Sequence, residues 1–350
     1  MKFIILALNG YVWARGRQAF RSAWGFEAGP LMAFVLLGML AVHQAGARMK
    51  RFGRLRHLLV VTSGVYMSFL LYFVFSLIAM DLIALAAPLS PAAGYFAALA
   101  LAVCISLYGV LNAGRVARVD YRVELGLGRP YRVALLSDLH MGDFVRPRHL
   151  RRVAGRVNAL NADLLLIAGD LFNGNGLQDM ADAPGALEAL KSLRARDGVY
   201  AVYGNHDPLP DEPQPLDFLR RAGIRLLRDE GVRVGPIYLV GRNDYSRPGL
   251  RAPLKALMNG DDCPGVVLDH NPWGIDEAAR AGAALVLCGH THRGQLAPIS
   301  LFTRRAVGKN YFYGLTRHGD TIAVITSGAG YFGLPMRVGT RCEVACLTLT

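Results

Sequence analysis

The sequence predicts a layered α/β domain preceded by an all-α transmembrane region. Long apolar runs occupy the first 112 residues. The 350-residue chain is 53% hydrophobic with a mean hydropathy of +0.28, which is more apolar than ordinary soluble enzymes. From residue 131 onward, short apolar runs typical of strands alternate with helical stretches, which indicates α/β layers. Two further apolar runs, Ile237–Val240 and Ile322–Ile325, predict a second sheet. The expected parts are a transmembrane region at 1–112, a connector at 113–130 and an α/β domain at 131–350.

Three apolar runs approach the length of about 20 residues that a membrane-spanning helix needs. They are Leu31–Ala47, Leu58–Ala87 and Tyr95–Leu111. Their close succession, with few charges inside, favours membrane spans over buried core helices. Met1–Ala14 is apolar but shorter, and the sequence leaves open a signal peptide or a tilted helix that continues toward Phe20. We therefore expect three to four spans.

The charge of the chain indicates contact with an anionic membrane surface. The net charge is +13, and 34 of the 39 basic residues are arginine, many of them beside apolar segments. This pattern favours membrane lipids as partners and gives no reason to expect nucleic acid, although a compositional bias toward arginine would look the same. The five cysteines form no CxxC pair, so we expect free thiols, as in a reducing compartment.

The loops between the expected spans also predict an orientation. The loop Arg48–His57 carries five basic residues, and the loop Pro88–Gly94 carries none. The positive-inside rule therefore places the first loop, and the domain that follows the last span, in the cytoplasm. Arg15, Arg17 and Arg21 oppose this orientation because they would then lie outside.

Five predicted strands of the α/β domain each lead directly into a short polar motif. The strands are Tyr131–Ser137, Asp163–Ala168, Val199–Tyr203, Pro264–Leu268 and Ala283–Cys288. The predicted helices are Arg148–Leu160, Gly185–Arg196, Leu216–Ala222 and Ile275–Ala281, with a candidate edge strand at Val119–Leu125. The motifs are Asp138-Leu139-His140, Gly169-Asp170, Gly204-Asn205-His206-Asp207, Asp269-His270-Asn271 and Gly289-His290-Thr291-His292. We expect these strand ends to point at one edge of a sheet, where open α/β sheets bind ligands.

The residue types in these motifs suit a divalent metal site. Imidazoles and carboxylates hold borderline metals such as Mn, Fe or Zn, and the amide oxygen of Asn is a less common but suitable ligand. Each motif alone is an ordinary turn, but five in this order are improbable by chance. The order DxH, GD, GNHD, H and GHTH resembles the calcineurin-like metallophosphoesterases over Tyr131–Thr350. The resemblance implies a two-sheet sandwich flanked by helices and a metal-dependent phosphoester hydrolase.

The resemblance also implies a role for each site residue. Two divalent ions are implied, the first held by Asp138, His140 and His292, the second by Asn205, His270 and His290, with Asp170 bridging both. A metal-bridging hydroxide is the implied nucleophile. His206 is implied to contact the phosphate and to protonate the leaving oxygen as a general acid. Asp207 is expected to orient or charge His206.

Two residues depart from the family pattern, and one segment resembles a particular branch of the family. Asn173 stands where relatives often have Asp after the GD motif, which leaves the substrate open. Arg293 stands where many relatives have glycine after the second histidine of GHTH, so it either binds a substrate phosphate or points to solvent. The segment Ser327–Arg337 resembles the glycine-rich closing segment of bacterial membrane-associated members, a branch that includes enzymes acting on lipids and on UDP-diacylglucosamine. A tight packing turn explains the same glycines equally well.

These observations lead to one function and two alternatives. We expect an integral protein of a bacterial inner membrane whose cytoplasmic domain is a phosphodiesterase or pyrophosphatase acting on a phosphorylated, lipid-linked substrate. The first alternative is a tethered phosphodiesterase that acts on soluble nucleotides. The second is a non-catalytic membrane sensor with a vestigial phosphoesterase domain, although a scaffold has no physical need for seven metal ligands.

Overall fold

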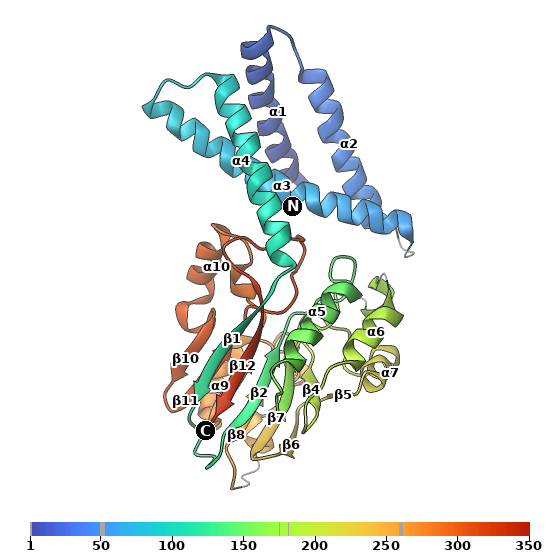
Figure 1. Ribbon diagram of the computed structural model, residues 1–350, viewed down its shortest axis with the longest axis vertical. Helices are drawn as coiled ribbons and strands as arrows, with labels where there is room; N and C mark the ends of the chain where they lie inside the picture. Colours follow the sequence, from blue (N-terminus) through green and yellow to red (C-terminus); the bar gives the residue numbers. More distant parts are fainter. Residues whose placement is uncertain (1, 50–52, 175, 181, 259–261) are drawn as a thin grey trace. The chain divides into compact units, whose positions relative to one another are not determined.

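The computed structural model describes residues 2–49, 53–174, 176–180, 182–258 and 262–350 (Figure 1). The chain divides into two compact units, Met1–Asn112 with Gly333–Met336 and Ala113–Phe332 with Arg337–Thr350. Each unit is described by itself. Two basic residues on which the predicted orientation partly depends, Lys50 and Arg51, lie outside the described residues.

The first unit is all-α, as predicted. Its helices are α1 (Lys2–Trp24), α2 (Gly29–Arg48), α3 (Arg54–Ala86) and α4 (Pro91–Ala113). Among the described helices, α2, α3 and α4 are long and apolar enough to cross a membrane, and α1 does not meet the same criterion. The turn before α4 is stabilised by Ser90, whose hydroxyl accepts a hydrogen bond from the Ala93 N–H at 3.1 Å. Helix α1 extends beyond the apolar stretch that ends at Ala14 and incorporates the arginines that follow it.

Polar contacts link α1 to its neighbours within this unit. Arg15 forms an ion pair with Asp81 of α3, and the Tyr11 hydroxyl donates a hydrogen bond to the same carboxylate. Arg17 pairs with Glu27 at 3.0 Å in the connection to α2. Ionisable groups in a membrane region are expected to pair in this way because an unpaired charge there is costly. Arg21 also lies 3.8 Å from Glu27, so all three arginines that oppose the predicted orientation have carboxylate partners.

The second unit is a sandwich of two six-stranded sheets, in agreement with the predicted fold class. The strands are β1 (Val116–Val123), β2 (Tyr131–Leu136), β3 (Leu164–Ala168), β4 (Val199–Val202), β5 (Ile224–Leu226), β6 (Glu230–Val234), β7 (Ile237–Gly241), β8 (Gly265–Leu268), β9 (Leu285–Cys288), β10 (Gly314–His318), β11 (Thr321–Ile325) and β12 (Cys342–Leu349). The first sheet has the order β1-β12-β2-β3-β4-β5, and the second has the order β10-β11-β9-β8-β7-β6. Strand β1, predicted near 119–125, is an edge strand of the first sheet.

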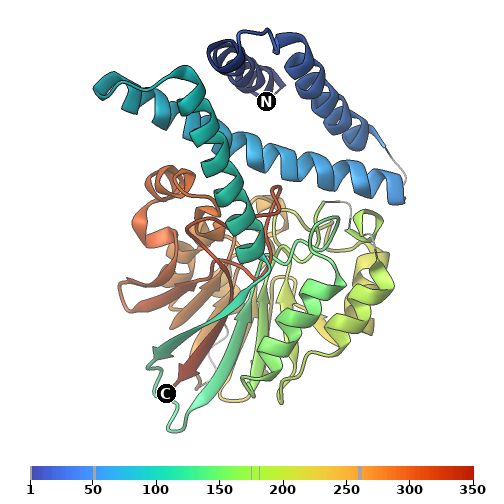
Figure 2. The ribbon, with the colours of Figure 1, turned by 45° about the horizontal axis from the view of Figure 1, so that its top comes forward.

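Alternation of side chains along the central strands builds the layers. In β2, Val133 and Leu135 pack into the core between the sheets, whereas Ala134 and Leu136 pack into a second core on the other face. Helices α5 (Pro147–Asn158), α6 (Ala183–Lys191) and α7 (Pro213–Arg221) cover that face of the first sheet (Figure 2). Helices α8 (Leu254–Leu257) and α9 (Ile275–Arg280) pack on the outer face of the second sheet, and α10 (Ile299–Val307) follows β9. Nearly continuous apolar runs such as Leu164–Ala168 are therefore buried on both faces.

One expectation about the sheets is wrong in detail. The five strands that lead into the polar motifs do not share one sheet, because β2, β3 and β4 belong to the first sheet and β8 and β9 to the second. An apolar run identifies a buried strand but carries no information about which sheet the strand joins. The motifs nevertheless meet, since the carboxyl ends of both sets of strands lie at the same end of the sandwich.

Candidate active site

The candidate ligands lie on loops at the carboxyl ends of five strands. Asp138 and His140 follow β2, Asp170 follows β3, Asn205 follows β4, His270 follows β8, and His290 and His292 follow β9. Nine described non-glycine residues have positive φ, and five of them belong to this set: Asp138, His140, Asp170, His290 and His292. Such conformations cost on the order of 1–3 kcal/mol each and accumulate at functional sites. The strain is therefore concentrated where the strands meet.

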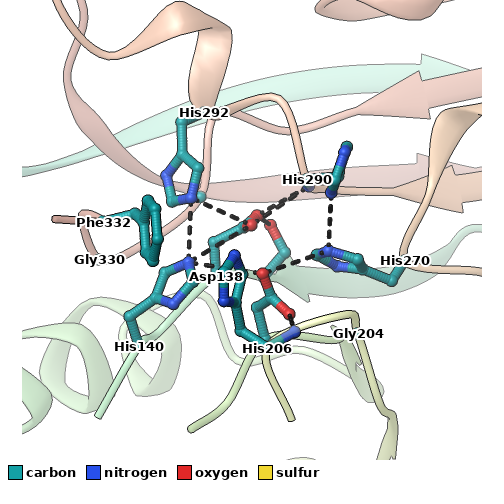
Figure 3. Close-up of polar contacts among 12 residues, drawn as sticks. Asp138, His140, Gly204, His206, His270, His290, His292, Gly330 and Phe332 are labelled. Atoms are coloured by element: carbon teal, nitrogen blue, oxygen red, sulfur yellow. Dashed lines mark hydrogen bonds and ion pairs between the residues drawn. The ribbon is translucent and has the colours of Figure 1, made fainter. Parts of the chain in front are cut away.

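One group of ligand atoms gathers around the loop after β2. The Nε2 atoms of His140 and His292 lie 3.0 Å apart, and the His292 Nε2 lies 3.3 Å from the Asp138 Oδ1 (Figure 3). The His140 Nε2 is also 3.5 Å from the Asp170 Oδ2. All four side chains are buried. Two nitrogens and two carboxylate oxygens thus face one small volume.

A second group lies beside the first. The Asn205 Oδ1 is 2.9 Å from the His290 Nδ1 and 3.2 Å from the His270 Nε2, and these two nitrogens are 3.2 Å apart. The His270 Nε2 lies 3.3 Å from the Asp170 Oδ2, the same oxygen that faces the first group. Asp170 therefore lies between the two groups. Its other oxygen accepts a hydrogen bond from the His206 N–H at 2.9 Å, which fixes the orientation of the carboxylate.

The donor set fits divalent cations. Two sets of three His or Asp side chains place ligand atoms within 4.8 Å of one another: Asp138, His140 and His292, and Asp138, Asp170 and His270. Facing imidazole nitrogens 3.0 Å apart can share only one proton between them, so lone pairs converge without enough donors. A cation relieves this excess of acceptors, and nitrogen with carboxylate oxygen is the set that borderline transition metals prefer.

Burial sets the protonation states of these side chains. It lowers the pKa of His140 to about 3 and that of His290 to about 4, so both rings are neutral and keep a free lone pair. Burial also raises the pKa of Asp138 to about 6. Burial alone would raise the pKa of Asp170, but the neighbouring His270 and His140 lower it overall. Burial would likewise lower the pKa of His270, yet Asp170 raises it well above the usual value. Neutral histidines and ionised carboxylates are the ligating forms.

Glycine is required where the backbone passes close to these side chains. A Cβ at Gly169, whose φ is +77°, would lie 2.7 Å from the His270 Cβ. A Cβ at Gly204 would lie 2.7 Å from the His270 ring and would also meet Asp170. Real Cβ atoms essentially never approach so closely, so the glycines of the GD and GNHD motifs allow β3 and β4 to approach the loop after β8.

His206 lies at the open side of the two groups. Its ring is half-buried, with its centroid 4.4 Å from that of Phe332 and 5.3 Å from that of His140 (Figure 3). Phe332 keeps 42% of its surface exposed, so the two rings form a partly open wall above the ligand atoms. A group in this position can reach a substrate oxygen without ligating a metal.

Asp207 has different partners from those expected. Its buried carboxylate accepts hydrogen bonds from the Phe172 N–H at 2.8 Å and the Gly204 N–H at 2.7 Å. In the described part of the chain, no hydrogen bond joins this carboxylate to the His206 ring. Burial and the charge of Asp170 raise its pKa to about 8. The structure thus assigns Asp207 to holding the loops after β3 and β4 together, and the expectation that it orients His206 finds no contact to support it.

The sequence interpretation missed Arg337. This side chain is fully buried, and its guanidinium donates hydrogen bonds to the backbone carbonyls of His292 at 2.8 Å, Ser327 at 2.8 Å and Gly330 at 2.6 Å. It therefore connects the glycine-rich segment to the loop that carries His292. A single arginine within a glycine-rich, apolar stretch was the available signal.

The glycine-rich segment Ser327–Arg337 has features of both a packing turn and an exposed aromatic loop. The Ala329 N–H donates to the Ser137 carbonyl at 2.9 Å, and the Gly330 N–H donates to the Asp138 carbonyl at 3.0 Å, as a packing turn would. A Cβ at Gly330 would meet the backbone of Leu139. Phe332, two residues further on, keeps exposed aromatic surface beside the site. The first half of the segment thus supports the loop after β2, and the aromatic residue faces outward.

Comparisons with known proteins agree with this geometry. The family model described as "Calcineurin-like phosphoesterase" matches residues 131–294. The chain is 32% identical over 279 residues to a "Transmembrane protein with metallophosphoesterase domain" of Danio rerio, covering 72% of this chain and 62% of that one. It is 33% identical over 230 residues to an "Uncharacterized metallophosphoesterase" of Helicobacter pylori, with coverages of 64% and 60%. It is 30% identical over 241 residues to "Uncharacterized metallophosphoesterase YkoQ" of Bacillus subtilis, with coverages of 65% and 86%.

The chain therefore belongs to the calcineurin-like metallophosphoesterase family, a class of metal-dependent phosphoric ester hydrolases. It spans about three fifths of the length of the first two relatives. One of these is named as a transmembrane protein, and the three candidate spans agree with membrane association. None of the three relatives is named for UDP-diacylglucosamine, so that closer resemblance remains a prediction.

Proposed function

We propose that this protein is a membrane-anchored phosphoesterase that hydrolyses phosphodiester or pyrophosphate bonds with two divalent ions. The observation that carries the proposal is the position of the Asp170 Oδ2, 3.5 Å from the His140 Nε2 and 3.3 Å from the His270 Nε2. A carboxylate oxygen shared by two groups of nitrogen and oxygen ligands is what a two-ion site requires. Such ions supply positive charge for both the attacking and the leaving oxygen of the phosphoryl group, and they lower the pKa of water.

The remaining residues of the site would hold the two ions and donate a proton. Asp138, His140 and His292 would hold one ion, Asn205, His270 and His290 the other. His206 would donate a proton to the leaving oxygen, since its ring lies at the open side, next to but outside both groups. Phe332 packs against this ring, with the ring centroids 4.4 Å apart.

We further propose that the substrate is lipid-linked and that residues 131–350 form a cytoplasmic catalytic domain, joined by a connector at 113–130 to a membrane region at 1–112. The three candidate spans keep the chain at a bilayer, and the exposed Phe332 gives the site an aromatic rim suited to an acyl-bearing molecule. The arginine-rich loop before α3 supports the cytoplasmic orientation. A reporter fused after Thr350 tests the orientation and is expected to read as cytoplasmic. A reading from the opposite side would contradict it.

The test of the two-ion site is the variant Asp170→Asn. Because the substitution removes the shared charge, the purified protein is expected to lose both ions and all activity on bis(p-nitrophenyl) phosphate. The matched control is Asp163→Asn. Asp163 precedes β3, whereas Asp170 follows the other end of that strand. The Asp163 carboxylate accepts a hydrogen bond from the Arg132 N–H at 2.7 Å. Elemental analysis that finds full metal content in Asp170→Asn would refute the bridging role.

A further inference from the structure

A basic cavity lies on the surface of the second unit, next to the candidate active site along the chain. Its volume is about 480 Å³. Four of the residues that line it are cationic, namely Arg293, Arg304 of α10, Lys309 and Arg317 of β10, and none of its lining residues is acidic. We call this cavity the basic pocket. Clefts lined by one sign of charge concentrate the field and attract counter-ions.

These four cations have no ion-pair partner in the described part of the chain. Among the residues that the structure describes, no carboxylate lies within 4.0 Å of any of these four side-chain charges. Elsewhere in the second unit, Arg251 does pair with an acid, Asp269, at 2.9 Å. Like charges gathered in one concave space repel one another, and an anion in the pocket removes that repulsion.

Contacts on the wall of the pocket connect it rigidly to the proposed metal ligands. Arg293 directly follows His292, and its φ of +53° turns the chain sharply between the two side chains. The Thr291 hydroxyl donates a hydrogen bond to the Phe312 carbonyl at 2.6 Å, which ties the ligand loop to the lining segment. The Arg293 guanidinium lies 4.3 Å from the centre of the Tyr313 ring. Stacking of this kind orients a guanidinium and leaves its N–H edge available.

We propose that the basic pocket binds a second phosphate group, carried by the same substrate as the scissile phosphoester. Arginine presents paired N–H donors that match phosphate oxygens, and the amide of Asn310 and the hydroxyl of Thr316 add neutral donors to the lining. The inference rests on the proposed phosphoesterase function and adds a substrate class to it, namely molecules with two phosphate groups. It also assigns a role to Arg293, which departs from the family pattern: this residue lines the pocket and directly follows the candidate ligand His292 in the sequence.

The experiment measures competition by compounds with one or two phosphonate groups. Hydrolysis of bis(p-nitrophenyl) phosphate by the full chain is inhibited with α,ω-alkane bisphosphonates of increasing length and with monophosphonates of the same length, at saturating free metal. At one linker length the bisphosphonate is expected to inhibit about tenfold more strongly than its monophosphonate, because it also forms charge-assisted hydrogen bonds in the pocket. The double variant Arg304→Ala/Lys309→Ala is expected to lose that preference and to retain the basal activity.

The matched control is Arg305→Ala. Arg305 is exposed on the same helix but does not line the basic pocket, so this variant has one cation fewer and should keep the preference. The proposal is overturned if no linker length gives a preference, or if the double variant and the control behave alike. It is also overturned if inorganic phosphate inhibits noncompetitively through the pocket, since a free phosphate would then be the ligand. Absence of any bis(p-nitrophenyl) phosphate hydrolysis by the wild-type protein would instead contradict the proposed function.

Discussion

Replacing His206 by alanine separates proton donation from metal binding. The backbone N–H that donates to Asp170 at 2.9 Å is kept in the variant, so the shared carboxylate stays in place. The lost imidazole is half-buried and packs mainly on Phe332, with the ring centroids 4.4 Å apart. Loss of a partly exposed ring contact is expected to lower the free energy of unfolding by only about 1 kcal/mol. Metal content and fold should therefore survive.

The loss of activity should depend on the leaving group. General acid catalysis contributes roughly 10²–10⁴-fold, which corresponds to about 3–5 kcal/mol of the barrier. An alkyl or sugar alkoxide needs the proton and should show that full loss in kcat/KM. A nitrophenolate leaves readily without it, so its loss should shrink to about tenfold or less. The assay is kcat/KM of wild type and His206→Ala on a series of phosphodiesters that differ only in the leaving alcohol.

Phe332→Ala is the matched control for this series. It removes the ring that packs against His206 but removes no acid, so its effect should be small and equal across the series. A uniform loss for His206→Ala would mean that the imidazole binds phosphate in the ground state and donates no proton. A loss of bound metal in the same variant would mean that the ring is itself a ligand. Either result would refute the assignment.

Two further predictions follow from buried charges. Arg337→Met should lower the free energy of unfolding by about 3 kcal/mol, because it removes a buried cation that donates to three carbonyls. Arg341→Met, at an exposed position, should change it by less than about 0.5 kcal/mol. Denaturant titration measures both variants, and equal effects would contradict the reasoning. Metal affinity should rise with pH, because an ion must displace the proton of His270 and, below about pH 6, that of Asp138 as well. Calorimetric titration should show about one decade of affinity per pH unit above pH 6 and about two below it, and a flat profile would contradict these protonation states.

Local patterns predicted most of the fold, because burial of apolar side chains leaves a recognisable pattern within a short stretch of sequence. The apolar run at Leu164–Ala168 predicts a strand from five residues alone, and in the structure it forms β3, with all five residues buried. The apolar length of α3 and α4 predicts candidate spans in the same way. The assignment of strands to two sheets could not be read from the sequence, since it depends on pairings such as β1 with β12, which are more than 200 residues apart.

The candidate site shows the same division. The convergence of its candidate ligands could be predicted because each one directly follows a strand, and because five polar motifs in a fixed order match a family. The roles of Arg337 and Phe332 could not be predicted, although both lie in the Ser327–Arg337 segment, because each acts through a contact with a residue distant in sequence. Arg337 reaches back 45 residues to the His292 carbonyl. Asp207 differs in the other direction: its position beside His206 in the sequence suggested a contact with that ring, whereas its carboxylate accepts hydrogen bonds from the Phe172 and Gly204 N–H groups.

The division of ligands between the sheets explains why the whole sandwich is needed for the proposed chemistry. The loops of the first sheet supply both carboxylates, Asp138 and Asp170, and the loops of the second supply His270, His290 and His292. Neither sheet alone brings together nitrogen and carboxylate donors in the number that two ions require. The 3.3 Å approach of the Asp170 Oδ2 to the His270 Nε2 is thus also a contact between the two sheets. Ions at this position would add to the apolar core in joining the two sheets. Because the ligand loops carry backbone strain at five positions, the packing of that core is what holds the ligands in place before any ion binds.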